Sequence, residues 1–337
     1  MHIQSGIKLL AEVSEQETRK RDGGTLLRSS QSFIPLADLE IYFNRLDMQA
    51  AGLVGTRPME LSKHGEASLP GFCASIPPAF TTLEEAGNSL DYHWNHCLQL
   101  LTDADKLHEG FKQRGEYLDI LTSWKFALDA FVSSTVLDRR GTQLYRVLRL
   151  CQMFYYISIH ASPDKTDFPE TNFDPYYEQH KQIVVWAQEF LRCHAHHCHN
   201  GVLEPYFCLG MNLIAPLYSV AHHCRDPLVR REAVQLLKTT PRQEGVWDSI
   251  LTGNVAESLI EMEERGLPQV TSRYDIPESA RVRGVKLEFD TEGKVCEVKF
   301  ARMADITKST EPGPGWIWSD GKGETAPRQW FDAVAAF

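Results

Sequence analysis

The stretch PYFCLGMNLIAPLYSVAHHCRDPLVRREAVQLLKTTPRQEGVWDSILTGNVAESLIEMEE, residues 205–264, decides the fold that we expect for this chain. It predicts three consecutive helices separated by clear start and stop signals. The first, residues 209–223, is apolar nearly all round, which is typical of a central buried helix. Pro216 lies within it, and we expect this proline to kink the helix.

The second and third helices have well-defined ends. Asp226 is an N-cap residue followed by Pro227 in the first turn, and Pro241 stops the second helix. Gly266 ends the third helix in the order expected for a helix C-terminus. The third helix carries an i, i+4 line of apolar residues, namely Trp247, Leu251, Val255, Leu259 and Met262.

The remaining segments extend this pattern. Apolar residues at helical spacing predict helices over residues 83–101, 117–137 and 142–160, and a further helix that begins with Asp174 as N-cap and Pro175 in its first turn. Beyond residue 279 the period becomes two. Residues 282–289 and 295–300 then predict a β-hairpin, followed by an irregular tail whose tryptophans (Trp316, Trp318 and Trp330) pack on the helices.

We therefore expect an all-α fold, an antiparallel helical array built from helix pairs, with a small C-terminal β-hairpin appendage. Residues 1–278 would form a helical domain of regulatory type. Residues 279–337 would form the hairpin and the tryptophan-containing tail packed on it.

Composition argues against two classes of partner. The chain has 337 residues and a net charge of -10, whereas a protein that binds DNA through its phosphates needs a basic face. Its short basic runs, Arg139–Arg140 and Arg230–Arg231 among them, are expected to be solvated helix faces. The mean hydropathy is -0.32, and no apolar run is long enough to span a bilayer, so we expect no membrane partner.

The cysteines and histidines provide metal-ligand chemistry without a metal-site pattern. Eight cysteines are scattered without a CxxC pair, which is typical of reduced thiols in the cytoplasm or nucleus. Residues 193–199 read CHAHHCH, and His222, His223 and Cys224 follow. The spacing matches no zinc finger and no catalytic zinc site, and histidines also favour the negative end of a helix dipole. We predict no metal and no cofactor.

Catalytic motifs are equally absent from the sequence. It contains no GxSxG, GxGxxG, GxxxxGK[ST] or HExxH. The acidic residues Glu261, Glu263 and Glu264 are predicted to lie on a solvated helix surface. No residue is assigned a catalytic role. If the helices enclose a cavity, the first residues to inspect in it are His93, His96, His160, His180 and Tyr218.

Several separate motifs resemble the C-terminal half of fungal zinc-cluster (Zn2Cys6) transcription factors. Four of them lie in the stretch quoted above and four lie elsewhere. They are NLIAPLY (212–218), CRDP (224–227), RREA with LL (230–237) and PRQEGVWDS (241–249), then IQSGIKLL (3–10), FNRLDMQA (43–50), IPPAF with LEEA (76–86) and the closing hairpin. These motifs occur in the family's order and extend over nearly the whole chain.

The resemblance implies a regulatory, or middle-homology-like, region without the N-terminal DNA-binding zinc cluster. The six-cysteine set of that cluster is absent from this sequence. We therefore expect a transcription-factor-like regulatory protein, associated with a fungal secondary-metabolite pathway and located in the nucleus or cytoplasm. It would act through a regulatory protein partner, a homodimer or a small-molecule metabolite, without direct nucleic-acid binding. A metabolite-binding enzyme on the same scaffold and a truncated zinc-cluster factor are the alternatives.

Overall fold

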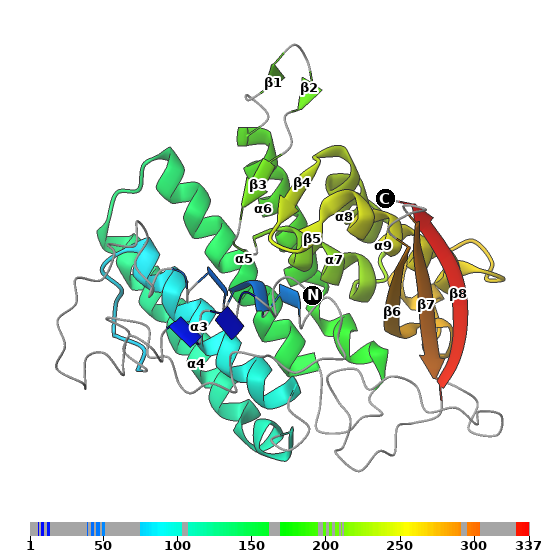
Figure 1. Ribbon diagram of the computed structural model, residues 1–337, viewed down its shortest axis with the longest axis horizontal. Helices are drawn as coiled ribbons and strands as arrows, with labels where there is room; N and C mark the ends of the chain where they lie inside the picture. Colours follow the sequence, from blue (N-terminus) through cyan, green and yellow to red (C-terminus); the bar gives the residue numbers. More distant parts are fainter. Residues whose placement is uncertain are drawn as a thin grey trace.

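The computed structural model describes residues 75–102, 107–161, 169–194, 198–199, 202–203, 206–208, 210, 212–290, 295–303 and 328–336, with scattered helical residues between 6 and 50. The main body is a set of α-helices (Figure 1). Their bounds are Leu83–Thr102 (α3), Leu107–Ser134 (α4), Arg139–Ala161 (α5), Tyr177–His194 (α6), Ile214–His223 (α7), Pro227–Thr239 (α8) and Ser249–Glu264 (α9). The predicted all-α class with a small C-terminal appendage is confirmed.

Neighbouring helices pack in antiparallel pairs. Near the start of α4, Arg114 donates to the carbonyl of Ile159 at the end of α5, which satisfies an orphan helix carbonyl. In the next pair, Arg146 of α5 forms an ion pair with Glu189 of α6 at 2.9 Å. The helices share one large core, in which the Trp124 indole donates to the carbonyl of Ala86.

The C-terminal appendage is a three-stranded antiparallel sheet of order β6-β7-β8, at one edge of the molecule (Figure 1). The predicted hairpin is confirmed as β6 (Val282–Asp290) and β7 (Val295–Met303). The prediction of an irregular tail is wrong for β8 (Arg328–Ala336), where Trp330 pairs with Ala301. Strand β8 pairs with the edge of β7 that β6 leaves open. The two strands are far apart in sequence, so local patterning does not reveal their pairing. Trp316 and Trp318 lie outside the described residues.

Short strands also occur before residue 279, where only helices were expected. A three-stranded sheet joins β3 (Tyr206–Cys208), β4 (Arg242–Glu244) and β5 (Trp247–Asp248), and β1 (Cys198–His199) pairs with β2 (Val202–Leu203). The turn between β4 and β5 requires Gly245, whose φ is +59°. These strands have two or three residues each, too few for a visible period-two pattern.

Two proline predictions are corrected. Pro175 lies inside a 3-10 helix, Glu170–Tyr176 (η2), and Asp174 pairs with Arg281 instead of capping α6. Pro216 does not interrupt α7, because the helix begins at Ile214 and the proline falls in its first turn. Backbone N–H groups in the first turn of a helix have no intrahelical acceptor, so the N–H that proline lacks removes no hydrogen bond there.

Candidate functional site

The centre of the candidate site is the corner between α7 and α8. Asp226 accepts hydrogen bonds from the backbone N–H groups of Leu228 and Val229, and Pro227 is the first residue of α8, as predicted. Arg225 precedes this cap with φ 48°, a left-handed conformation that is uncommon for a residue with a side chain. Its side chain is fully buried, so the corner carries a charged group into the interior.

Arg225 belongs to a buried ion-pair network that joins three other elements. Its Nη2 lies 2.7 Å from Oε1 of Glu263 on α9, and its Nη1 lies 3.1 Å from Oε2 of Glu170 in η2. Arg230 of α8 reaches the other oxygen, Oε2 of Glu263, at 2.7 Å. Two guanidinium groups thus face two carboxylates, and their charges cancel.

This network corrects two predictions. Glu263 and Arg230 were expected on solvated helix faces, yet both are 0% exposed. Burial opposes ionisation of Glu263, but Arg225 and Arg230 outweigh it and lower its pKa to about 2. Their neighbours Arg231 and Glu264 pair with each other near the surface, as the helix-face interpretation requires. Helical spacing shows which residues share a face, but it does not show which face becomes covered.

Three histidines border the ion pairs. The rings of His222 and His223 stack at 4.1 Å between centroids, and Phe173 stacks on His223 at 3.8 Å. His223 donates from Nδ1 to Oε2 of Glu170 at 3.2 Å, and His222 donates from Nε2 to the carbonyl of Val282 at 3.1 Å. In the described part of the chain, neither ring nitrogen of the buried His180 has a hydrogen-bond partner.

All three imidazoles are held neutral. Burial lowers the pKa of His180 and of His222 to about 3, with Arg225 acting in the same direction on both. Burial and Arg225 also lower the pKa of His223 well below its ordinary value. Glu170 does not reverse this effect, because the adjacent Arg225 already neutralises it. The cluster therefore contains three uncharged bases beside a balanced set of charges.

The cluster also anchors the first residue of β6. The N–H of Val282 donates to Glu263 Oε1 at 2.8 Å, and its carbonyl accepts from Arg225 and His222. A second set of contacts lies beside it: Arg281 forms a bidentate pair with Asp174, and Glu278 accepts from the N–H groups of Glu170 and Thr171. Elements from both sides of the predicted boundary at residue 278/279 thus meet here.

Carboxylate and imidazole are good metal ligands, so the cluster is a candidate metal site. Donor atoms of Glu170, His222 and His223 all lie within 4.8 Å of one another. However, Oε2 of Glu170 already accepts from Arg225 and His223. The two imidazole rings are stacked with 4.1 Å between centroids and planes inclined by only 17°, so their in-plane lone pairs lie in two separate, nearly parallel planes and do not converge on one point. A divalent cation would also leave the balanced cluster with excess positive charge. The donor set does not fit a metal.

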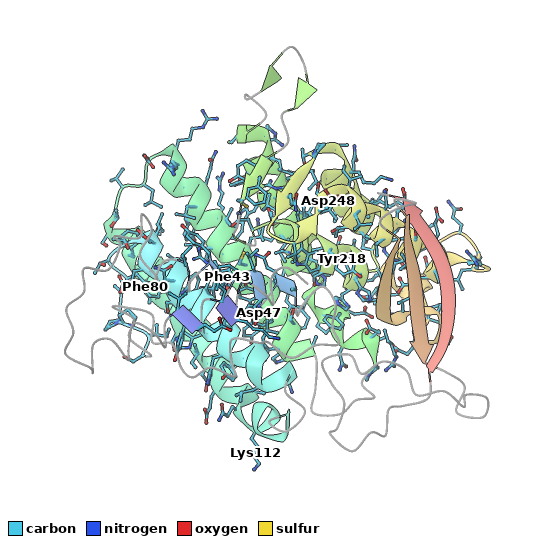
Figure 2. The ribbon with its side chains drawn as sticks, in the orientation of Figure 1. Phe43, Asp47, Phe80, Lys112, Tyr218 and Asp248 are labelled. Atoms are coloured by element: carbon cyan, nitrogen blue, oxygen red, sulfur yellow. The ribbon has the colours of Figure 1, made fainter. Side chains whose placement is uncertain are left out.

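The structure distributes the residues proposed for a shared cavity over several places. His180 and Tyr218 border the cluster. The centroid of the Tyr218 ring lies 5.8 Å from that of His222, and Figure 2 shows Tyr218 near the centre of the molecule. His96 instead pairs with Tyr117, 2.5 Å from its hydroxyl, and stacks with Tyr92, next to His93 on α3. His160 pairs with Tyr176 at the end of α5.

The other sequence candidates have different outcomes. The side chains of residues 194–199, which carry most of the CHAHHCH motif, lie outside the described residues. Among the described side chains, His222 and His223 lie beside Glu170. Sequence reasoning missed Glu170, Arg225 and Glu263 as members of one site. The only local signal was the unusual corner that Arg225, Asp226 and Pro227 form.

Another buried carboxylate, outside the cluster, caps a helix. Glu244 of β4 is 0% exposed and accepts from the backbone N–H groups of Asn212, Leu213 and Ile214 at the start of α7. Arg242 pairs with it at 3.0 Å. Glu244 therefore caps a helix whose own N-cap residue, Leu213, provides no side-chain acceptor.

Comparison with known proteins gives a partial relationship. The aspercryptin biosynthesis cluster-specific transcription regulator atnN of Emericella nidulans is 34% identical over 102 residues. Part of this chain is homologous to a fungal transcription regulator. The match covers 28% of this chain and only 16% of the length of that regulator. No family model matches the chain, and no solved structure does. Among the described helices, none is long and apolar enough to cross a membrane.

Proposed function

We propose that this chain is a transcription-factor-like regulatory protein of a fungal secondary-metabolite pathway. It acts through contacts with a regulatory protein or a second copy of itself, or by sensing a small metabolite, and not through DNA contacts of its own. We place it in the nucleus. The observation that carries this proposal is the 34% identity to a regulator specific to a biosynthesis cluster.

The distribution of charge supports the absence of direct DNA contacts. The net charge is -10, and several arginines are unavailable to phosphate. The arginines that are both buried and paired with carboxylates include Arg225, Arg230, Arg242 and Arg281. Binding through phosphates needs cations on an accessible face.

The buried cluster has the character of a scaffold. Its carboxylates accept from guanidinium, imidazole or backbone N–H groups, and the carbonyl of Val282 accepts from Arg225 and His222 on other elements. A general base needs a substrate proton within hydrogen-bond reach, whereas the carboxylates of this cluster already accept from arginine, histidine or backbone donors. The cluster therefore supports a regulatory fold more directly than a reaction centre.

Deletion of the gene in its source organism, with transcripts and metabolites profiled together, tests the proposal. We expect transcripts of one biosynthetic cluster to fall and to recover when the wild-type gene is returned. Unchanged transcripts together with one accumulated intermediate would overturn the regulatory role and indicate the metabolite-binding enzyme.

A gel-shift assay tests the mode of action separately. The purified chain should give no sequence-dependent shift with promoter fragments of the affected cluster, whereas an intact zinc-cluster factor serves as the positive control. A shift that one specific fragment competes away, and a scrambled fragment does not, would show that the chain contacts DNA itself.

A further inference from the structure

A second, smaller hydrophobic core lies between α9 and the C-terminal sheet. It consists of Val255, Leu259 and Met262 from α9 with Val282, Val285 and Val298 from β6 and β7. Ala256 and Ile260, on another side of α9, belong to the large helical core. Helix α9 thus packs on two separate cores, and the sheet is attached to the helical body through the smaller one.

The polar cluster closes one end of this small core. Val282, a member of the core, is also the residue whose N–H and carbonyl bind Glu263, Arg225 and His222. Detaching β6 from α9 would break these three hydrogen bonds and expose the cluster to water. The state of the cluster and the attachment of the sheet are therefore coupled.

The connection between α9 and β6 allows such a movement. It runs over residues 265–281 and contains only two short 3-10 turns, Arg273–Asp275 (η3) and Glu278–Ala280 (η4). Gly266, the second residue of this connection, has φ +80°, and a Cβ built on it would meet no atom within 4 Å. The last residues of the connection, Glu278 and Arg281, bind η2 and stay with the helical body, so the sheet would separate after Arg281, at the first residue of β6.

We propose that His222 and His223 form a pH-sensitive latch: when they take up protons, β6–β8 detach from α9 while the large helical core stays folded. This inference does not depend on the proposed regulatory function. It concerns only how the sheet is attached.

The charges around the two imidazoles explain the direction of the effect. They are faced by Glu170 of η2, His180 of α6, Tyr218 of α7, Arg225 at the corner, Arg230 of α8 and Glu263 of α9. Two cations already balance two anions, so an imidazolium in the closed state would be an uncompensated buried charge. In the open state water stabilises that charge.

Proton uptake on opening sets the pH window. Burial lowers the pKa of His222 to about 3 in the closed state, whereas its ordinary value is 6.5. Closure is therefore undisturbed above pH 6.5 and weakens as pH falls below it. Each imidazole that takes up a proton shifts the ratio of closed to open molecules by up to about tenfold per pH unit.

Hydrogen exchange of the full chain, read by mass spectrometry between about pH 7.5 and pH 5.5, tests the latch. After correction for intrinsic exchange, peptides from β6, β7 and β8 should lose protection as pH falls, by up to about tenfold per pH unit for each imidazole. Peptides from α3, α4 and α5 should keep theirs. Equal loss in the sheet and in these helices at every pH would overturn the proposal.

Matched variants identify the groups responsible. His222→Gln and His223→Gln can still donate a hydrogen bond but cannot take up a proton, so each should flatten the pH dependence of the sheet peptides. His160→Gln alters an exposed histidine outside the cluster and should leave that dependence unchanged. A double variant, H222Q with H223Q, that retained the full wild-type dependence would also overturn the latch.

Discussion

Arg225 and Glu263 form an ion pair of 2.7 Å in which neither side chain is exposed to solvent. Arg225 lies in a left-handed corner, and Glu263 lies near the end of α9. The pair connects the corner between α7 and α8 to the last turn of α9. Its stability depends on both partners, because a buried charge without its counterion costs far more than a buried pair.

Replacing Glu263 with Gln should lower the free energy of unfolding by about 3–5 kcal/mol, because Arg225 and Arg230 would share no counterion on α9. Urea denaturation followed by circular dichroism measures this change. Glu257→Gln is the matched control on the same helix: Glu257 pairs with Lys238 near the surface, and its loss should cost only ~0–1 kcal/mol. Equal effects of the two variants would contradict the buried network.

Replacing Glu244 with Gln should destabilise the start of α7. The variant loses the charge that binds three backbone N–H groups, and we expect a cost of about 1.5–3 kcal/mol. Thermal or urea unfolding gives the value. Gln243→Ala changes an exposed neighbour on the same strand and should cost much less. A Glu244 variant as stable as the Gln243 variant would mean that the cap contributes nothing.

Asp226→Ala should cost about 1 kcal/mol, since α8 loses the side chain that accepts from Leu228 and Val229. Asp226→Asn keeps the accepting oxygen and should recover most of that loss. The comparison of both variants in denaturant separates capping from helix propensity. If Asn were as damaging as Ala, the carboxylate charge and not the cap would be the important feature.

His180→Leu should raise the free energy of unfolding by ~1 kcal/mol near neutral pH. Among the described residues His180 has no hydrogen-bond partner, and an unsatisfied buried polar group costs about that much or more. The measurement is chemical denaturation beside His160→Leu, which removes an exposed imidazole that is hydrogen-bonded to Tyr176 and should therefore give no stabilisation. Clear destabilisation by His180→Leu would show that the imidazole has a partner or packing role that its surroundings do not reveal.

Global stability should decrease as pH falls. A base whose pKa is lowered by folding does not reduce the free energy of unfolding at pH values above its ordinary pKa. As the pH falls below that ordinary pKa, the unfolded state takes up the proton more readily and the free energy of unfolding decreases. For His180 and His222 the window therefore runs from 6.5 down to about 3. Each should contribute at most about 1.4 kcal/mol per pH unit within it. Denaturation series at several pH values measure the slope, which H222Q should reduce. A slope unchanged in that variant would contradict the buried neutral imidazole.

Periodicity and caps predicted much of the fold from local information. Asp226 with Pro227 gave the correct start of α8, and the apolar residues from Leu251 to Met262 lie within α9, because such features arise from neighbours within a turn or two. Trp247, expected in the same helix, lies in β5 instead, one residue before the N-cap Asp248. The hairpin of β6 and β7 was predictable for the same reason. Strand β8 was not, because its partner is distant in sequence and its own composition contains no turn signal that fixes the pairing.

The helical class, the start of α8 at Asp226 and Pro227, and the resemblance to fungal regulators follow from local sequence features alone. Only the tertiary structure decided that Arg230 and Glu263 are buried and that Glu170, His222 and Arg225 meet at one site. The physical reason is one of range. Capping and helical spacing depend on contacts a few residues apart, whereas the burial of a charge depends on whether distant elements bring its counterion.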